Sequence, residues 1–445
     1  MSASIRFPDR FLWGAATSAY QIEGSPLADG AGESNWHRFT HEQRGDTGDV
    51  ACDHYRRFEE DVAIMNEIGL AAYRFSIAWS RIQPDGRGRP NRRGIDFYSR
   101  LVDALLESGI RPCVTLYHWD HPAALDERGG WLSPDMPRRF ADYASIVYDA
   151  LGDRAAMWMT LNEPWVVAHA GFMGGVHPPG HRSAAETAVA SRHMLLAHSL
   201  AVRAGRAGGR SPIGLVVNIE PKDAASDDRE DIAARERADI YMNRQYLAPL
   251  YREGPPKGLA GIYGDRWPGF TDDDLALIAE PVDFLGINYY TRAVVRHDER
   301  VLPDRAKPVR QEGAEYTETG WEVFPEGLTR TLLRIKEQCG EIPLYITENG
   351  AAFPDPASVR GDTLSDPLRV DYFRAHLRAV HEAIDAGVDV RGYFAWSLMD
   401  NLEWSQGFSK RFGLVHVDFE TGKRTMKESA RFYQEVIKTN GEALG

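Results

Sequence analysis

Short apolar runs alternate with longer amphipathic stretches along the whole chain. Eight runs rich in β-branched and aromatic residues predict strands, and each is followed by a stretch with apolar residues at helical spacing. The predicted strands are Phe11–Ala16, Ala72–Trp79, Arg111–Trp119, Ala156–Asn162, Ile213–Ile219, Val282–Tyr290, Pro343–Glu348 and Arg391–Ser397. The helical stretches lie around Tyr55–Ile68, Phe97–Gly109, Arg139–Leu151, His193–Ala204, Arg235–Tyr251, Pro325–Glu337, Val370–Ala386 and Glu428–Lys438. This alternation is typical of βαβ units and a parallel sheet.

Eight strand–helix pairs predict an α/β fold, a single (β/α)8 TIM barrel with extended βα loops that spans residues 1–445 as one domain. The chain of 445 residues exceeds the length of about 250 that such a barrel needs, which leaves room for long loops. A doubly wound open sheet is the alternative, less favoured because no G-x-G-x-x-G follows a strand candidate. The charged, weakly patterned segment Arg292–Phe324 is interpreted as an inserted loop after the sixth strand.

Composition narrows the class of function. The chain carries 52 basic and 65 acidic residues, a formal charge of −13, which disfavours nucleic acid and anionic membranes as partners. No apolar run is long enough for a membrane span, and Met1–Arg10 lacks the order of a secretory leader, so we expect a cytoplasmic protein with no membrane partner. Three cysteines without a C-x-x-C pair predict neither a disulfide framework nor a zinc site. No metal and no cofactor is expected, and a homo-oligomer is left open.

Polar residues stand where predicted strands end, the part of such a barrel that carries active sites. They are Gln21, Arg74, His118, Trp119, Asn162, Glu163, Asn288, Tyr290, Glu348 and Trp396. Two apolar strands thus each deliver one carboxylate, Glu163 and Glu348, to the same rim. Two carboxylates beside Trp, His, Asn and Tyr, without a metal-ligand cluster, indicate acid/base and nucleophilic chemistry at an acetal carbon, as in glycoside hydrolysis. Eleven tryptophans fit this interpretation, because indole faces pack on sugar rings.

Such chemistry needs one carboxylate ionised and the other protonated at one pH. Arg74 and the hydroxyl of Tyr290 are candidates for keeping one carboxylate ionised, since a nearby cation and donated hydrogen bonds favour the anion. The negative charge of that group would help to keep the other protonated. Taken alone, Glu163 before Pro164 could be a helix-start charge, and Asn349-Gly350 could mark a turn. His121 and His177 are interpreted as structural.

Four segments in order closely resemble glycoside hydrolase family 1, the β-glucosidase family. They are Phe11–Gly24 (FLWGAATSAYQIEG), Thr160–Pro164 (TLNEP), Ile346–Gly350 (ITENG) and Trp396–Trp404 (WSLMDNLEW). The resemblance implies a retaining double displacement, with Glu348 as the nucleophile and Glu163 as the acid/base. It also implies carboxyl groups roughly 5–5.5 Å apart. The implied substrate is a terminal non-reducing β-D-glucoside or an oligosaccharide, with β-galactosidase and β-fucosidase activity beside it and a role in cellulose degradation.

The same resemblance suggests a set of sugar-binding residues. It implies that Asn162 holds the 2-hydroxyl, that Glu403 accepts from the 4- and 6-hydroxyls, that Trp396 forms the pocket floor and that Trp165 faces the leaving group. Glu403 also argues against 6-phosphorylated sugars, and Glu163 against sulfur-linked glucosides, whose hydrolases carry glutamine there. The complete candidate set for substrate contact is Gln21, His118, Trp119, Asn162, Trp165, Asn288, Tyr290, Trp396, Glu403, Trp404 and Phe412, with Arg74 in support.

Three other functions stay open at this point. Transglycosylation would use the same site with an alcohol or a sugar in place of water. A non-catalytic sugar-binding module is disfavoured by the presence of both glutamates. A metal-dependent barrel isomerase would need His and carboxylate ligands at neighbouring strand ends, which the sequence does not offer.

Overall fold

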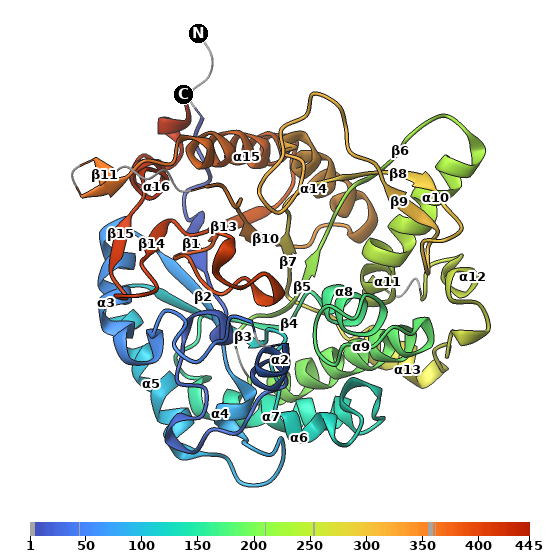
Figure 1. Ribbon diagram of the computed structural model, residues 1–445, viewed down its shortest axis with the longest axis horizontal. Helices are drawn as coiled ribbons and strands as arrows, with labels where there is room; N and C mark the ends of the chain where they lie inside the picture. The colour runs from blue at the N-terminus through green and yellow to red at the C-terminus, as the bar shows by residue number, and fades with distance from the viewer. Residues whose placement is uncertain (1–4, 44, 210, 252–253, 355–358, 361) are drawn as a thin grey trace.

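Eight parallel strands close into a barrel in the order β1-β13-β10-β7-β5-β4-β3-β2 (Figure 1). The computed structural model describes residues 5–43, 45–209, 211–251, 254–354, 359–360 and 362–445; residues 1–4, part of the segment considered for a secretory leader, lie outside them. The barrel strands are β1 (Leu12–Ala16), β2 (Ala72–Ser76), β3 (Arg111–Tyr117), β4 (Met157–Asn162), β5 (Ile213–Asn218), β7 (Phe284–Asn288), β10 (Leu344–Asn349) and β13 (Val390–Trp396). The predicted barrel is confirmed, and the open sheet is excluded.

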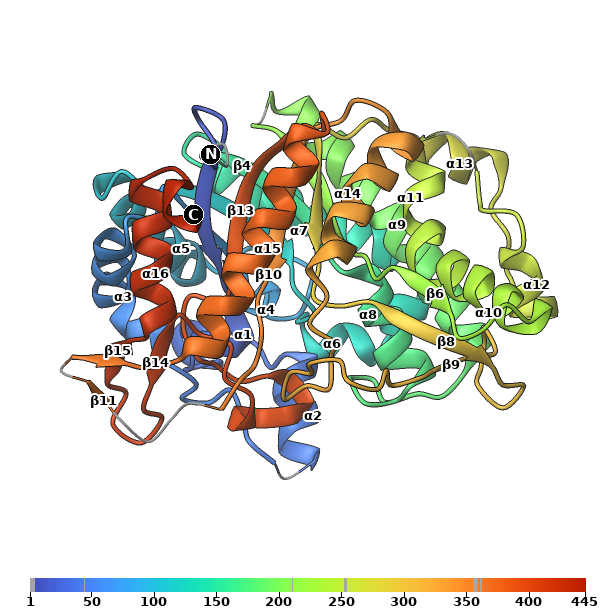
Figure 2. The ribbon, with the colours of Figure 1, turned by 90° about the horizontal axis from the view of Figure 1, so that it is seen from above.

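Long helices follow the strands and cover the outside of the barrel (Figure 2). They are α3 (His54–Ile68), α5 (Arg92–Glu107), α7 (Met136–Leu151), α9 (Ala184–Ala207), α10 (Arg229–Asp239), α14 (Pro325–Cys339), α15 (Pro367–Asp385) and α16 (Glu428–Lys438). Shorter helices lie in the connections: α1 (Ala19–Ile22), α2 (Asn35–Gln43), α4 (Trp79–Ile82), α6 (Ala123–Asp126), α8 (Pro164–Ala168), α11 (Gln245–Leu247), α12 (Leu259–Tyr263) and α13 (Asp272–Ile278). No helix within the described ranges has the length and apolar character to cross a membrane.

Apolar side chains fill two layers, because successive residues of a strand point to opposite faces. On β13, Tyr393 and Ala395 pack between strand and helices, whereas Phe394 and Trp396 belong to a separate cluster with Met157 of β4. Both faces of each strand are therefore buried, which explains the nearly continuous apolar runs in the sequence.

Two sequence-based interpretations of the connections need correction. The stretch Arg235–Tyr251 is not one helix: α10 begins at Arg229, and a π-helical turn at Ile240–Arg244 separates it from α11. The segment Arg292–Phe324 is not only a loop, because it contains β8 (Ala293–His297) and β9 (Ala306–Pro308), which extend from β6 (Lys222–Ala224) as a three-stranded sheet. This sheet packs on α10 through small side chains, a pairing that short strands do not reveal by periodicity. The remaining short strands are β11 (Val359–Arg360), β12 (Thr363–Leu364), β14 (Val415–Val417) and β15 (Arg424–Met426).

The barrel is irregular in β4, which Glu163 follows, and in β10, which contains Glu348. The register shifts between Met159 and Asn162 in the pairing of β4 with β5, and near Glu348 in the pairings of β10 with β7 and β13. Such irregularities re-aim side chains beside active sites. They occur here at the carboxyl ends of the strands, where the βα loops begin.

Candidate active site

Glu163 and Glu348 are both buried at the carboxyl end of the barrel, with 6% and 3% of their surface exposed. Glu348 lies in β10, and Glu163 directly follows β4 and precedes Pro164, the first residue of α8. The backbone of Glu163 is left-handed, with φ of 48°, a conformation that costs a residue with a side chain roughly 1–2 kcal/mol. Strained positions of this kind are concentrated at functional sites.

Glu348 is held by two donors, one on each oxygen. Arg74 Nη1 donates to Glu348 Oε1 at 2.6 Å, and the hydroxyl of Tyr290 donates to Oε2 at 2.6 Å. Burial raises the pKa of Glu348, and the Arg74 cation and the Tyr290 hydrogen bond act in the opposite direction. Burial and the charge of Glu348 raise the pKa of Tyr290 well above its usual range. The phenol therefore stays protonated and donates a hydrogen bond to Glu348. These contacts favour an ionised Glu348.

Glu163 has a different environment. Asn288 Nδ2 donates to Glu163 Oε1 at 2.6 Å, and no cation pairs with this carboxyl group among the described residues. Burial and the negative charge of Glu348 raise the pKa of Glu163 to about 8. At neutral pH this shift favours the protonated form of Glu163, whereas the two donors on Glu348 favour the anion of that group. Opposite protonation states at one pH are what an acid and a nucleophile require.

Asn162 connects the two carboxyl groups through its neighbours. Its Oδ1 accepts from Arg74 Nη2 at 2.6 Å and from Asn288 Nδ2 at 3.0 Å. Its Nδ2 lies 3.1 Å from His118 Nε2, an arrangement in which that ring nitrogen accepts. A continuous network thus runs from Glu348 through Arg74, Asn162 and Asn288 to Glu163. His118 Nδ1 has no partner within the described part of the chain and carries the proton in this tautomer.

Aromatic rings and a third carboxylate form the other wall of the site. His118 stacks on Trp396 and Trp404, with centroid distances of 5.6 and 5.8 Å. Gln21 Nε2 lies 3.4 Å from Glu403 Oε2 and also donates to the Leu402 carbonyl at 2.9 Å. Burial and the charge of Glu348 raise the pKa of Glu403 to about 8. A carboxyl group so poor in partners has free capacity to accept from a polar ligand.

Gly350 explains why the Asn349-Gly350 pair does not form an ordinary turn here. A Cβ atom at Gly350 would lie 1.7 Å from the Trp396 carbonyl oxygen. Only glycine therefore allows the end of β10 to approach the end of β13. Asn349 is buried as well, and its Nδ2 donates to the Tyr289 carbonyl at 2.7 Å. This close contact fixes the strand end that carries Glu348.

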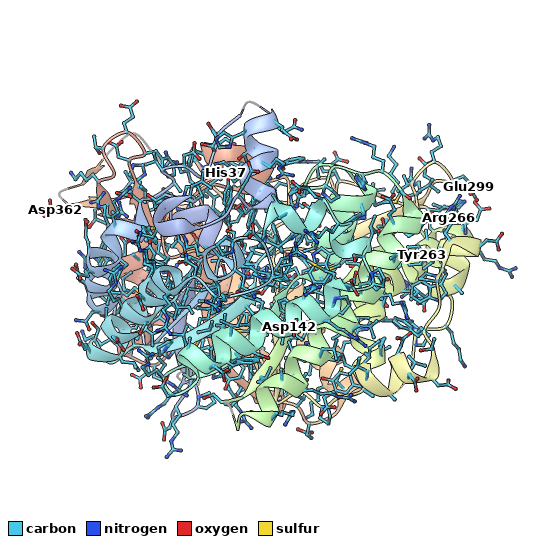
Figure 3. The ribbon with its side chains drawn as sticks, turned by 90° about the horizontal axis from the view of Figure 1, so that it is seen from below. His37, Asp142, Tyr263, Arg266, Glu299 and Asp362 are labelled. Carbon is cyan, nitrogen blue, oxygen red and sulfur yellow. The ribbon has the colours of Figure 1, made fainter. Side chains whose placement is uncertain are left out.

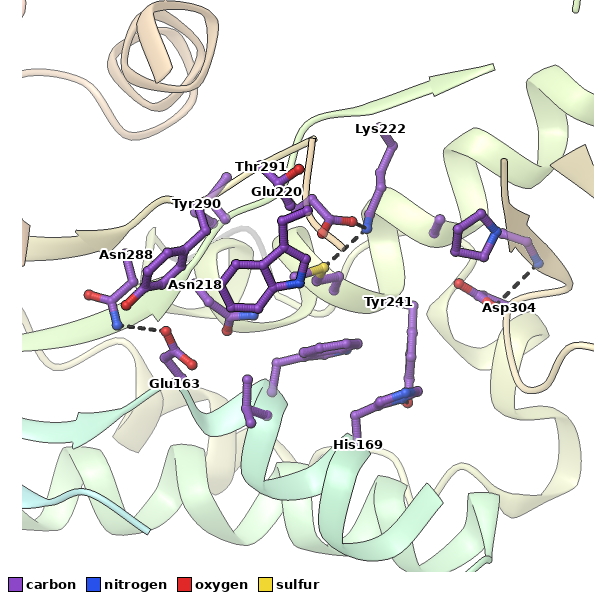
Figure 4. A pocket seen from close by; sticks show the side chains of 18 of the residues that line it. Glu163, His169, Asn218, Glu220, Lys222, Tyr241, Asn288, Tyr290, Thr291 and Asp304 are labelled. Carbon is purple, nitrogen blue, oxygen red and sulfur yellow. Dashed lines mark hydrogen bonds and ion pairs between the residues drawn. The ribbon is translucent and has the colours of Figure 1, made fainter. Parts of the chain in front are cut away.

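A cavity of about 480 Å³ opens above these residues (Figure 4). Seven of the sequence-predicted residues line it: Trp119, Glu163, Trp165, Asn288, Tyr290, Glu403 and Trp404. Others lie directly behind the lining, in contact with a residue that lines it: Gln21, His118, Asn162, Glu348, and Arg74 beneath Glu348. Trp396 stacks beside His118 in the same wall. Phe412 is buried behind Tyr290, with ring centroids 6.2 Å apart, and does not line the cavity.

The outer part of the cavity contains residues that the sequence analysis did not select. Trp321, Lys222, Glu220, His169 and Tyr241 line it, as does His177, which was interpreted as structural. The segment Arg292–Phe324 contributes several lining residues, among them Val301, Asp304 and Trp321. Lys222 pairs with Glu220 at this end (Figure 4). Trp165 stacks on His169 with centroids 4.4 Å apart, between the buried glutamates and this outer region.

Comparison with known proteins identifies the family of the chain. A sequence profile described as glycosyl hydrolase family 1 matches residues 3–442. The chain belongs to glycosyl hydrolase family 1. The resemblance carried by the four motifs is thereby confirmed over nearly the whole length of the chain.

Two family 1 relatives and one solved structure are similar along their full lengths. β-Glucosidase A of Thermotoga maritima is 46% identical over 444 residues, which cover 98% of each chain. A bifunctional β-D-glucosidase/β-D-fucosidase of Bifidobacterium breve is 44% identical, with 97% of this chain and 98% of the relative covered. The structure of a Thermotoga maritima β-glucosidase in complex with galacto-hydroximolactam superposes with a TM-score of 0.94 at 45% identity, over 98% of this chain and 99% of that one.

Proposed function

We propose that this family 1 protein is a retaining β-glucosidase that hydrolyses terminal non-reducing β-D-glycosyl residues, with residues 1–445 as one catalytic domain. The observation that carries the proposal is the pair of buried glutamates in opposite electrostatic environments at one barrel mouth. The relatives named as β-glucosidases support it. The implied substrate is a small β-glucoside or oligosaccharide, and no metal or cofactor takes part in the steps below.

In the first step Glu348 is the nucleophile. Its carboxylate attacks the anomeric carbon while Glu163 donates its proton to the departing glycosidic oxygen, so a glycosyl ester of Glu348 forms as the aglycone leaves. Arg74 and Tyr290 orient the attacking carboxylate through one hydrogen bond to each oxygen. In the second step Glu163, now an anion, takes a proton from water, and the water oxygen displaces Glu348 from the sugar. Two inversions restore the β configuration.

We propose that the sugar in the first subsite is bound by six side chains: Asn162, Gln21, His118, Glu403, Trp404 and Trp396. His118 Nδ1 and Glu403 supply a donor and an acceptor that lack strong protein partners. Buried polar groups that are satisfied only by substrate reject analogues that cannot pair with them. Because one carboxylate can accept from the 4- and the 6-hydroxyl, we propose that glucosides, galactosides and fucosides are all accepted, as the bifunctional relative's name suggests.

Glu403→Gln is expected to lower kcat/KM for aryl β-D-glucosides by about 10-fold or more. Hydroxyls of a bound sugar that donate to Glu403 favour its anion and act against the raised pKa of the free site, and the variant loses this charged hydrogen bond of about 1.5–3 kcal/mol. The β-D-fucoside is the 6-deoxy counterpart of the β-D-galactoside, so this pair serves as an internal control for the 6-hydroxyl, and the fucoside should lose less than the galactoside. Steady-state kinetics on these substrates measure the difference. An unchanged kcat/KM would remove Glu403 from the sugar site.

The pH profile of kcat/KM is expected to fall on the alkaline side near pH 8. Glu163 must carry a proton to act as the acid, and its pKa is raised to about 8, so the competent form is present below that value and lost above it. Initial rates at low substrate concentration between about pH 5 and 10 measure the limb. A profile that stays flat to pH 10 would contradict the assignment of the proton to Glu163.

The experiment that tests the proposed function compares kcat/KM across aryl β-D-glycosides and β-linked glucose disaccharides of different linkage. The proposal expects turnover of aryl β-D-glucosides, with retained configuration in the first-formed product by NMR. Transglycosylation would appear as transfer of the glycosyl group to an added alcohol, with a ratio of transfer product to hydrolysis product above the molar ratio of alcohol to water. A sugar-binding module would bind these compounds without turnover, an outcome that would overturn the proposal.

We further propose that the enzyme works in the cytoplasm. Cys52 and Cys113 are buried free thiols, a state that a reducing compartment preserves. A homo-oligomer remains a separate proposal, which sedimentation velocity would test.

A further inference from the structure

Two histidines and an aspartate converge at the rim of the molecule, away from the proposed catalytic residues. His37 and His41 lie one turn apart on α2, so their side chains share a face of the helix (Figure 3 labels His37). Asp49 reaches them from the loop that follows the helix. His41 Nε2 lies 3.1 Å from Asp49 Oδ2, and His37 Nε2 lies 3.5 Å from Asp49 Oδ1. One ligand atom from each of the three residues fits within a span of 4.8 Å.

The other nitrogen of each imidazole is already held by an acceptor. His37 Nδ1 faces Glu33 Oε1 at 3.2 Å, and His41 Nδ1 donates to the His37 carbonyl oxygen at 2.7 Å. Glu33 is itself fixed by Arg38, whose Nε and Nη2 donate to its other oxygen at 3.0 and 2.9 Å. Histidines that bind metals characteristically donate their second ring N–H to a carboxylate or a backbone carbonyl, which fixes the tautomer and aims the free nitrogen. Both Nε2 atoms are aimed in this way at the Asp49 carboxylate.

We propose that His37, His41 and Asp49 form a binding site for a divalent transition-metal ion such as Zn²⁺. Ligand atoms about 2.0–2.1 Å from a tetrahedral zinc ion lie about 3.3 Å from one another. The two N···O separations of 3.1 and 3.5 Å bracket that value. Two imidazoles and one carboxylate are a ligand set suited to zinc and its neighbours, and the exposure of His41 and Asp49 leaves room for water as a fourth ligand.

The site departs from the sequence-based prediction that the chain has no metal site. That prediction rested on the lack of a C-x-x-C pair and of His and carboxylate ligands at neighbouring strand ends, whereas these ligands come from a helix and a loop in the first βα connection. The His-x-x-x-His spacing of His37 and His41 is visible in the sequence, but the approach of Asp49 is not. Without a metal, His41 and Asp49 form a histidine–aspartate ion pair. The hydrogen bond to the His37 carbonyl and the charge of Asp49 raise the pKa of His41, whereas desolvation lowers it. Zinc must displace that proton, so binding is expected to release protons.

A bound metal would act on the substrate site through the neighbouring, buried face of α2. Trp36 is buried on that face, and its ring lies 4.5 Å from the ring of Trp404. Thr40 hydrogen-bonds the hydroxyl of Tyr20 at 2.7 Å, and Tyr20 stacks on Trp404. In the loop that carries Asp49, Asp46 accepts from the Phe408 backbone N–H at 2.9 Å. An ion that ties α2 to this loop would therefore stiffen the support of Trp404 and raise the thermal stability of the enzyme.

The test is calorimetric titration of the full-length, chelator-treated and desalted enzyme with ZnCl₂, together with its melting temperature with and without Zn²⁺. The proposal expects saturable binding of one ion per chain, release of protons on binding and a higher Tm. His41→Gln and Asp49→Asn should each weaken binding by about 10-fold or more. Neither residue belongs to the proposed catalytic machinery, so both variants should keep the activity of the unmodified enzyme in the absence of metal.

His181→Gln is the matched control, because His181 is another exposed histidine paired with a carboxylate, Glu186, at 2.7 Å. It should bind Zn²⁺ as tightly as the unmodified enzyme. No saturable binding of Zn²⁺ would overturn the proposal. So would equal affinity in His41→Gln and the unmodified enzyme, or a loss in His181→Gln as large as that in His41→Gln.

Discussion

Glu348→Gly is expected to lose hydrolysis of an activated aryl β-D-glucoside by about 10⁵-fold in kcat, since no other group can form the covalent intermediate. Added azide should restore turnover, because this small anion can occupy the space left by the carboxylate. It would attack the anomeric carbon from the same side in one displacement, so the product is the α-glycosyl azide. Rates with 2,4-dinitrophenyl β-D-glucoside and NMR of the azide product measure both effects. A β-glycosyl azide would show that the roles of the two glutamates are reversed.

The control for this experiment must separate chemistry from stability. Removing Glu348 leaves the buried Arg74 without its partner, which costs roughly 3–5 kcal/mol in other buried pairs. Glu23 offers a matched environment, because it too is buried, accepts from Arg81 at 2.7 Å and accepts from a tyrosine hydroxyl, that of Tyr98, at 2.7 Å. Glu23→Gln and Glu348→Gln should lower the Tm similarly, yet only Glu348→Gln should lose turnover per folded molecule.

The parts of the fold and site that could be predicted from sequence are those with a local pattern. The barrel strands are buried on both faces, so each appears as an apolar run, and Glu163 and Glu348 are conspicuous because charge follows such a run directly. Arg74 stands out for the same reason within β2. Its placement beside Glu348 followed from the closure of the barrel and from the need to ionise one carboxylate, and the structure brings the two together.

The parts that could not be predicted depend on contacts between segments distant in the sequence. Strand β8 is short and pairs with β6 across about seventy residues, and the three-residue β9 pairs only with β8, so no periodicity marks either strand. Trp321 reaches the cavity on the segment that follows this small sheet, and Lys222 lies on β6 itself. A lone histidine carries no pattern in the sequence, so the interpretation of His177 as structural does not anticipate its place in the cavity wall, where its ring lies 5.4 Å from that of Trp119. The raised pKa of Glu163 likewise depends on burial and on Glu348, which lies on another strand.

These two classes of residue divide the site by function. The inner wall around Asn162 and Glu403 is built at strand ends and by Trp396–Trp404, one of the four segments that resemble the family. The outer wall is built by connections between barrel strands, including the segment Arg292–Phe324. Because loops tolerate change while the barrel beneath them holds its geometry, we propose that the sugar and the aglycone are recognised by separate parts of the chain. Substrates that differ only in the leaving group therefore test the proposed role of Glu163 as the acid.

Glu163→Ala is expected to affect substrates according to the leaving group. A dinitrophenolate departs without protonation, so the first step should be nearly preserved, whereas a poor leaving group should lose about 10²–10⁴-fold in kcat/KM. The second step loses its general base with every substrate, so the glycosyl ester of Glu348 should accumulate and give a burst of dinitrophenol. Azide needs no base, and its attack on that ester should restore turnover with the β-glycosyl azide as product. Stopped-flow bursts and kcat/KM across a series of aryl glucosides measure these effects, and equal losses for good and poor leaving groups would contradict the role of Glu163 as the acid.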